Sequence, residues 1–282
     1  MAVKSQSVFR QLFFLCIMFL SGLASGKSGF APVEQWQLEY QISGKGSPVI
    51  FLEAGGNSPL TDWDGIYDQL TQHTTVVRYS RVANGNSSQV KQHFMSSDYA
   101  RHASQVLNHL NIHEPVLFVA HSYGGSVARD FAAAYPKRIA GLLMLDPSSE
   151  HDVDILRAID LKQGNKEIAQ IKLDDMKNQM SNQYLDFWSK RPLPDYPAIP
   201  DIPVTVIASI KPSKNPPNLF FTDKGRELWG KLWQDWTKAF PQGKAILTKK
   251  SGHYIQFDQP ELVVSEVLSM WRKLKDDGIK TR

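Results

Sequence analysis

Strand-like and helix-like patterns alternate along most of the chain. Short segments that are continuously apolar, or that alternate apolar and polar residues, indicate strands of a largely buried sheet. These segments are 37–42, 48–52, 75–79, 115–120, 141–145, 203–208 and 245–247. Between them, apolar residues recur at helical spacing, which predicts helices over 61–72, 97–110, 126–135, 223–240 and 261–274. The alternation predicts an α/β fold, with a mostly parallel sheet flanked by helices on both faces.

Residues 152–199 interrupt this alternation. They show no strand pattern, but they contain helical patterns over 155–161 and 166–188 and a proline-rich stretch over 192–197. A long insertion between two strands of a sheet commonly forms a lid or cap. We therefore expect one domain over residues 27–282, in which 152–199 form a helical lid before the penultimate strand.

The first residues have the pattern of an export signal. Basic residues precede an apolar run over 12–20, and small residues follow over 21–26. The apolar run is shorter than the roughly 20 residues that span a bilayer, which argues against the alternative of a membrane anchor. We expect a signal peptide over residues 1–26, cleaved after Ala24 or Gly26, and hence a secreted or periplasmic protein without a stable membrane anchor.

Composition and charge narrow the possible partners. The 282 residues are 42% hydrophobic and 21% charged, which is typical of a globular protein and excludes a disordered chain. The formal charge of +4 is too small to favour nucleic acid as a partner. Cys16 is the only cysteine and lies in the expected signal peptide. The mature chain would therefore have neither a disulfide nor a thiolate metal site.

Ser122 lies at the junction of a predicted strand and a predicted helix. Residues 120–125 read Ala-His-Ser-Tyr-Gly-Gly and follow directly on a buried strand. A serine on such a sharp turn holds its hydroxyl above the sheet edge, and small neighbours let the strand and helix backbones approach each other. This placement predicts that Ser122 is a nucleophile; the alternative is that it only caps the helix.

His253 is the candidate base for this serine, whose hydroxyl needs a group to accept its proton. Among the eight histidines, His253 follows the last predicted strand, at the sheet edge where open parallel sheets bind ligands. The alternative is an ordinary turn histidine. His121 adjoins Ser122, but its side chain should point away from the hydroxyl. We interpret the histidines at positions 73, 93, 102 and 151 as surface or loop residues.

Asp146 is the candidate acid that would orient this histidine and stabilise its protonated form. It directly follows the strand predicted over 141–145, whereas the strand over 203–208 has no acid at its end. The resulting chain order, Ser122, Asp146, His253, is that of nucleophile-elbow hydrolases. The alternative acids are Glu150, Asp152 and Asp223.

Two backbone amides are candidates for an oxyanion hole, a pair of N–H donors aimed at the negative oxygen that forms during acyl transfer. One is the amide of Tyr123, next to the nucleophile. The other belongs to the loop after the strand 48–52, where Gly55 and Gly56 let the backbone approach a substrate. We favour Gly56 over Gly55; the alternative is that both glycines only form a turn.

These motifs together resemble the α/β-hydrolase-fold serine hydrolases, a family that includes esterases and lipases. The resemblance rests on the Ser122 turn, the segment 251–261 around His253 and the glycine loop after residue 52. It implies an eight-stranded, mostly parallel sheet with a variable lid. It also implies a Ser122–Asp146–His253 triad, with oxyanion amides from Gly56 and Tyr123.

We expect a hydrolase that cleaves small-molecule carboxylic esters through an acyl-serine intermediate, with neither a cofactor nor a metal. One alternative is an amide or peptide hydrolase, for which Glu53 is a candidate ligand of a substrate amino group. Another alternative is a non-catalytic binding protein that keeps the fold. Aromatic residues of the expected lid line a substrate site or pack the lid onto the core: Tyr184, Phe187, Trp188 and Tyr196. A helical stripe is interpreted as core: Trp229, Trp233 and Trp236.

Overall fold

The computed structural model describes residues 26–92, 94–177 and 196–278. The expected signal peptide, apart from Gly26, lies outside the described residues, as do Tyr184, Phe187 and Trp188 of the expected lid. No helix in the described ranges is long and apolar enough to cross a membrane.

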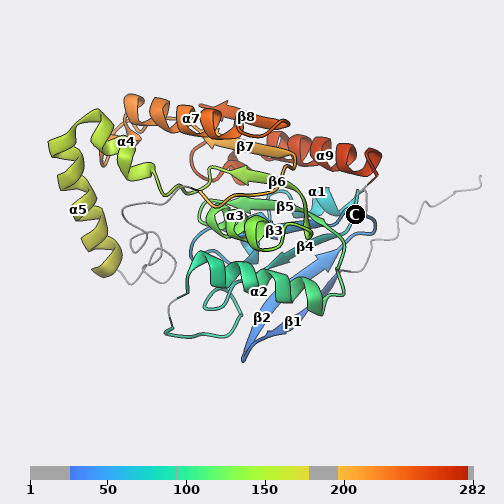
Figure 1. Cartoon of the computed structure of the whole chain (residues 1–282). Helices are drawn as coiled ribbons and strands as arrows, with labels where there is room; N and C mark the ends of the chain where they lie inside the picture. The colour runs from blue at the N-terminus through green and yellow to red at the C-terminus, as the bar shows by residue number, and fades with distance from the viewer. Residues whose placement is uncertain (1–25, 93, 178–195, 279–282) are drawn as a thin grey trace, which may run out of the picture.

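An eight-stranded sheet forms the centre of the molecule (Figure 1). Its strands lie in the order β1-β2-β4-β3-β5-β6-β7-β8. Strand β2 pairs antiparallel with both β1 and β4, and all other neighbours are parallel. The strands are β1 (Lys27–Val33), β2 (Trp36–Ser43), β3 (Ile50–Glu53), β4 (Val76–Tyr79), β5 (Val116–His121), β6 (Ile139–Leu145), β7 (Val204–Ser209) and β8 (Gly243–Thr248). The mostly parallel sheet expected from the sequence is confirmed.

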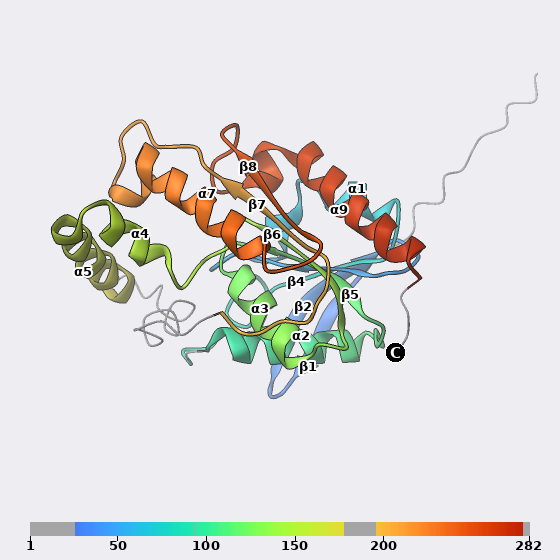
Figure 2. The same ribbon diagram turned by 45° about the horizontal axis from the view of Figure 1, so that its top comes forward.

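Helices cover both faces of this sheet (Figure 2). One apolar core joins it to α2 (Ser96–His109), α3 (Gly124–Ala134) and α7 (Asp223–Thr237). A second core joins it to α1 (Tyr67–Thr71) and α9 (Pro260–Asp276). Because both faces are covered, the central strands are apolar along their whole length, and the apolar runs of the sequence locate them.

Strand β1 and the segment expected to form one helix over 61–72 differ from the sequence prediction. Strand β1 was not expected, because a segment containing Gly29 and Pro32 has little strand character; the edge of a sheet tolerates proline. The helix expected over 61–72 is divided into the 3₁₀-helix η1 (Leu60–Trp63) and α1. Gly65 lies between them, where a Cβ would come within 2.4 Å of the carbonyl oxygen of Gln256.

His102 also differs from its interpretation as a surface residue. It lies on α2 and is fully buried among the rings of Trp36, Phe94 and Tyr99. Neither of its ring nitrogens has a hydrogen-bond partner among the described residues. Burial lowers the pKa of His102 to about 4, so the ring is neutral in the folded protein at neutral pH.

Two helices lie between β6 and β7, within the insertion expected from the sequence. They are α4 (Asp152–Ile159) and α5 (Leu161–Lys177), and they extend beyond one end of the sheet (Figure 1). A small apolar cluster joins Val153 and Leu156 of α4 to Ile168 of α5, and it also contacts the 3₁₀-helix η2 (Leu219–Phe221). The helices α4, α5 and η2 lie next to the edge of the sheet that is formed by the carboxyl ends of β5 to β8.

Candidate functional site

Ser122 occupies a sharp turn between β5 and α3. Its φ of +52° lies in the left-handed region, which non-glycine residues rarely adopt. A Cβ on Gly124 would come within 2.6 Å of the carbonyl oxygens of Glu53 and Ala54, and one on Gly125 within 2.4 Å of Pro147. Side chains larger than hydrogen therefore do not fit at positions 124 and 125 unless the neighbouring backbone or Pro147 moves. The backbone holds the hydroxyl at the end of the strand, as the sequence predicts.

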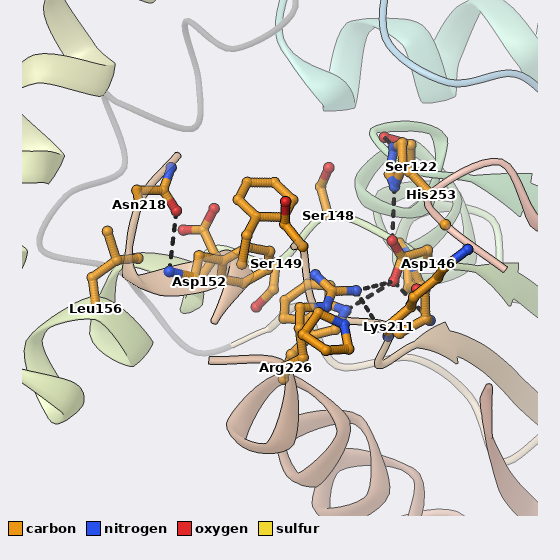
Figure 3. A pocket seen from close by; sticks show the side chains of 18 of the residues that line it. Ser122, Asp146, Ser148, Ser149, Asp152, Leu156, Lys211, Asn218, Arg226 and His253 are labelled. Carbon is orange, nitrogen blue, oxygen red and sulfur yellow. Dashed lines mark hydrogen bonds and ion pairs between the residues drawn. The ribbon is translucent and has the colours of Figure 1, made fainter. Parts of the chain in front are cut away.

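The structure brings Ser122, Asp146 and His253 together (Figure 3). His253 Nε2 lies 2.8 Å from Ser122 Oγ, and His253 Nδ1 lies 2.7 Å from Asp146 Oδ2. Asp146 follows β6 with a φ of +36°, and His253 lies between β8 and α8 (Ile255–Asp258). Three segments that are distant in sequence thus form one chain of hydrogen bonds.

Asp146 is buried and surrounded by donors. Its Oδ1 accepts hydrogen bonds from the Ser209 amide over 3.1 Å and from Trp229 Nε1 over 2.8 Å, and the Arg226 guanidinium lies 3.4 Å away. Burial alone would raise the pKa of Asp146, but its hydrogen bond to His253, the charges of His253 and Arg226, and the Trp229 hydrogen bond lower it below the usual value. The carboxyl group is therefore ionised.

The alternative acids have other positions. Glu150 pairs with Arg129 over 2.7 Å, away from His253. Asp223 is exposed at the start of α7, and Asp152 begins α4. Asp146 is the acid that meets the histidine.

The glycine loop after β3 is held by buried polar groups. The Gly55 amide donates to Asp62 Oδ2 over 2.8 Å, which commits it to a contact within the protein. Arg81 donates to the carbonyl oxygens of Ala54 and Gly55, which anchors the loop from the other side. Gly56 comes next and is only partly buried. The oxyanion roles of Gly56 and Tyr123 remain predictions, and Gly55 is a poor alternative because its N–H is already used.

Glu53 cannot serve as the ligand of a substrate amino group. It has no exposed surface, and both Tyr79 and Arg81 donate hydrogen bonds to its carboxylate. Glu53 is the last residue of β3, not part of the loop expected after residue 52, and the cation that it binds belongs to the protein itself.

A cavity of about 660 Å³ opens beside Ser122 and His253. Its walls are mostly apolar and come from α4, α5, η2 and α7: Val153, Leu156, Ile171, Phe220, Phe221 and Trp229. Lys211 and Arg226 also line it and place positive charge near Asp146 (Figure 3). A cavity with this lining suits an apolar group carried by a substrate.

Two aromatic residues have roles that the sequence left open or missed. Tyr196 packs its ring against Trp233 and Trp236, with centroid distances of 6.1 and 5.9 Å. Of the two expectations for this residue, it therefore follows packing onto the core. Trp229 is buried as expected, yet its indole also donates to Asp146 and lines the cavity. No sequence signal singles out Trp229 or Arg226, because their contact with Asp146 exists only in the folded chain.

Comparisons with known proteins agree with this architecture. Residues 47–190 match the family described as alpha/beta hydrolase fold. An uncharacterized protein of Mycobacterium tuberculosis is 28% identical over 146 residues, which are 51% of this chain and 42% of that protein. An uncharacterized hydrolase of Bacillus subtilis is 31% identical over 107 residues, which are 38% of this chain and 37% of that protein. The matches thus span less than half the length of these curated relatives.

Solved structures share the fold at low sequence identity. An esterase from Thermogutta terrifontis superposes with a TM-score of 0.58 at 20% identity, covering 89% of this chain and 99% of the esterase. An enol-lactonase from Burkholderia xenovorans gives a TM-score of 0.60 at 19% identity, covering 86% of this chain and 98% of the lactonase.

Proposed function

Because the chain belongs to the α/β-hydrolase family, we propose that it is a serine hydrolase that cleaves carboxylic esters through an acyl-serine intermediate. The observation that carries the proposal is the pair of hydrogen bonds of 2.8 and 2.7 Å that connects Ser122 to His253 and His253 to Asp146. This arrangement supplies a nucleophile, a base and a group that orients the base.

The reaction begins when Ser122 Oγ attacks the ester carbonyl carbon and His253 Nε2 takes the hydroxyl proton. The ionised Asp146 accepts the Nδ1–H of His253, which leaves Nε2 free to act as the base and stabilises the protonated ring. The resulting tetrahedral oxyanion is stabilised by the amides of Gly56 and Tyr123, and by the N-terminal end of α3.

Collapse of the tetrahedral intermediate breaks the bond to the alcohol, which takes its proton from His253. The acyl group stays on Ser122. Water then attacks the acyl carbon while His253 Nε2 accepts its proton, and the carboxylic acid leaves as Ser122 regains its hydrogen. Each step uses only side chains, backbone amides and water.

The apolar cavity supports an ester with an apolar acyl group as the substrate. The lining residues from α4, α5 and η2 bury carbon atoms, and each buried methylene of a substrate is worth about 0.8 kcal/mol. The ratio kcat/KM should therefore rise with acyl length until the cavity is full.

Labelling with a fluorophosphonate tests this proposal directly. The folded protein should form a covalent adduct on Ser122, and Ser122→Ala should form none. Ser126→Ala is a matched control, since Ser126 lies on the first turn of the same α3 helix and its hydroxyl accepts a hydrogen bond from Arg129. Absence of an adduct in the unsubstituted protein would favour a non-catalytic binding protein.

A substrate series separates ester from amide hydrolysis. p-Nitrophenyl esters of increasing acyl length should be cleaved, and Ser122→Ala should lower kcat by about 10⁴-fold or more with folding intact. Aminoacyl amides should be poor substrates. Preferential cleavage of the amides would replace the ester proposal with a peptidase or amidase.

A further inference from the structure

A second histidine–aspartate pair lies beside the proposed triad. Asp62 in η1 and His121 at the end of β5 are 5% and 1% exposed. Asp62 Oδ2 lies 2.8 Å from His121 Nδ1, and the ring of His121 lies 4.8 Å from that of His253 between centroids. The hydrolytic steps described above give this pair no task.

Asp62 is an ionised acceptor. Its Oδ2 accepts from the Gly55 amide over 2.8 Å, and its Oδ1 accepts from Gln256 Nε2 of α8 over 3.1 Å. Burial alone would raise the pKa of Asp62, but the hydrogen bond and charge of His121, with the Gly55 and Gln256 hydrogen bonds, lower it below the usual value. The nitrogen of His121 that faces this carboxylate must therefore be a donor.

The other ring nitrogen of His121 faces a second acceptor. Its Nε2 lies 3.1 Å from the backbone carbonyl oxygen of His253. The ring of His121 therefore lies between the Asp62 carboxylate and the backbone of His253, and it connects these two groups.

We propose that Asp62 and His121 are positioning residues for the hydrolysis described above, on which this role rests. Asp62 holds the Gly55 amide, directly before the oxyanion candidate Gly56. His121 holds the carbonyl of His253, the base itself. The Asp62–His121 pair thus connects the two loops that must be aligned around Ser122. Because it is buried, its hydrogen bonds are stronger than they would be in water.

Nuclear magnetic resonance tests this connection without any substrate. In protein labelled with ¹⁵N-histidine, Asp62→Asn should move the ring nitrogen signals of both His121 and His253, because His121 contacts the His253 carbonyl and its ring lies against that of His253. His121→Gln and His253→Gln assign the signals, and Glu150→Gln should leave them in place. Signals of His253 that do not move in folded Asp62→Asn would overturn the proposal, whether or not the protein hydrolyses esters.

Kinetics test the positioning role. Asp62→Asn and His121→Gln should each lower kcat by about 10²-fold with KM nearly unchanged, because they misplace reacting groups without altering the cavity. Glu150→Gln is the control: it also removes a charge from a buried pair, with Arg129, but contacts neither loop. It should retain kcat within a few-fold.

The possible outcomes separate the two proposals. An unchanged kcat in folded His121→Gln, or equal losses in His121→Gln and Glu150→Gln, would refute the positioning role. If Asp62→Asn does not fold, the kinetics and the His253 signals of His121→Gln decide. Full activity of Ser122→Ala would instead refute the hydrolase proposal, and the spectra would still test the connection between the two loops.

Discussion

The carboxylate of Asp146 is held by groups from three segments besides its own. The end of β7 contributes the Ser209 amide, α7 contributes Trp229 and Arg226, and the loop after β8 contributes His253. These donors keep a buried acid ionised, and they fix which of its oxygens faces the histidine. These contacts thereby fix both the charge of Asp146 and its orientation toward His253.

Replacing Asp146 by Asn tests this assignment at the level of one atom. The amide keeps the shape but removes the charge and favours the wrong tautomer of His253, so kcat should fall by about 10⁴-fold. Glu150→Gln provides the comparison, because its carboxylate pairs with Arg129 instead. Steady-state kinetics on a p-nitrophenyl ester measure both variants. Loss of activity in Glu150→Gln alone would show that the acid is misassigned.

Trp229→Phe isolates one hydrogen bond to Asp146. Phenylalanine keeps most of the ring but loses the N–H that donates over 2.8 Å, so kcat should fall about 10-fold, the equivalent of roughly 1.4 kcal/mol. Trp233→Phe is a matched control on the same helix, since its Nε1 is buried without a hydrogen-bond partner among the described residues. Equal effects of the two substitutions would mean that packing, rather than the hydrogen bond, matters here.

At the scale of elements, α4, α5 and η2 build the wall of the cavity that faces the carboxyl edge of the sheet. Val153 and Leu156 of α4 pack with Ile168 of α5, while Ile171 of α5 reaches the cavity. The residues of the candidate triad thus lie at the edge of the sheet, and the helices between β6 and β7 supply apolar surface of the cavity. Because α5 contributes to the cavity wall and not to the triad, we expect substitutions in α5 to change acyl preference without changing the steps of the proposed hydrolysis.

Ile171→Trp tests whether α5 determines acyl length. The larger ring would fill part of the cavity of about 660 Å³, so kcat/KM for long acyl esters should fall about 10-fold relative to short ones. Leu173→Trp is the control, because Leu173 lies on the same helix but is 62% exposed. A parallel loss for short and long esters in Ile171→Trp would indicate general damage rather than a change in specificity.

Elements were predicted best from the sequence where a local property of the segment, such as burial of a strand on both faces, determines them. The strands β3, β5, β6 and β7 are buried on both faces, which forces runs of apolar residues that can be recognised without the structure. The strand β1 and the division between η1 and α1 depend on neighbours distant in sequence, such as Gln256 beside Gly65. Local patterns contain no information about such contacts.

The same distinction applies to the candidate site. Ser122, Asp146 and His253 were predicted because each ends or follows a strand at one edge of the sheet. Asp62 and His121 were not predicted as a pair, because they are 59 residues apart in sequence and lie on separate elements. Two polar side chains that meet only in the folded chain have no fixed spacing in the sequence. A residue at the end of a buried strand, in contrast, follows an apolar run that can be recognised in the sequence.

At the scale of the whole molecule, the parallel strands bring the residues of the candidate site to one edge of the sheet. Strands β5, β6, β7 and β8 run in the same direction, so the residues that follow them lie side by side. The antiparallel β1 and β2 widen the sheet on the opposite side of β4 without contributing a site residue. The geometry of the candidate triad therefore depends on the pairing of these parallel strands.

Export is a prediction about the location and the N-terminal processing of the whole chain. Expression of the full chain in a bacterial host should yield a periplasmic or secreted protein whose N-terminus begins at residue 25 or 27, after removal of the apolar run over 12–20. N-terminal sequencing measures this. Replacing apolar residues of that run with charged ones should leave the protein in the cytoplasm, and recovery of an uncleaved membrane-bound chain would favour an anchor.

Buried His102 makes the stability of the whole molecule depend on pH. Its pKa is about 4 in the folded protein and about 6.5 when unfolded, so the unfolded chain binds more protons between these values. Stability contributed by the neutral ring is present above about pH 6.5 and is lost as the pH falls toward 4. Between about pH 7 and pH 5 the loss is about 2 kcal/mol.

His102→Leu should remove this dependence, since leucine suits a site lined by Trp36, Phe94 and Tyr99 and does not titrate. Urea unfolding at about pH 7 and pH 5 should show a decrease in the free energy of unfolding that is about 2 kcal/mol smaller in His102→Leu than in the unsubstituted protein. His113→Leu, at an exposed position after α2, should keep the full decrease. Carboxylates remote from His102 are common to all three proteins, so their contribution cancels in the comparison. Glu34 lies 3.8 Å from His102 Nε2, so its interaction with this histidine is part of the measured difference. If His102→Leu and the unsubstituted protein lose the same free energy, protonation of this histidine does not limit stability in acid.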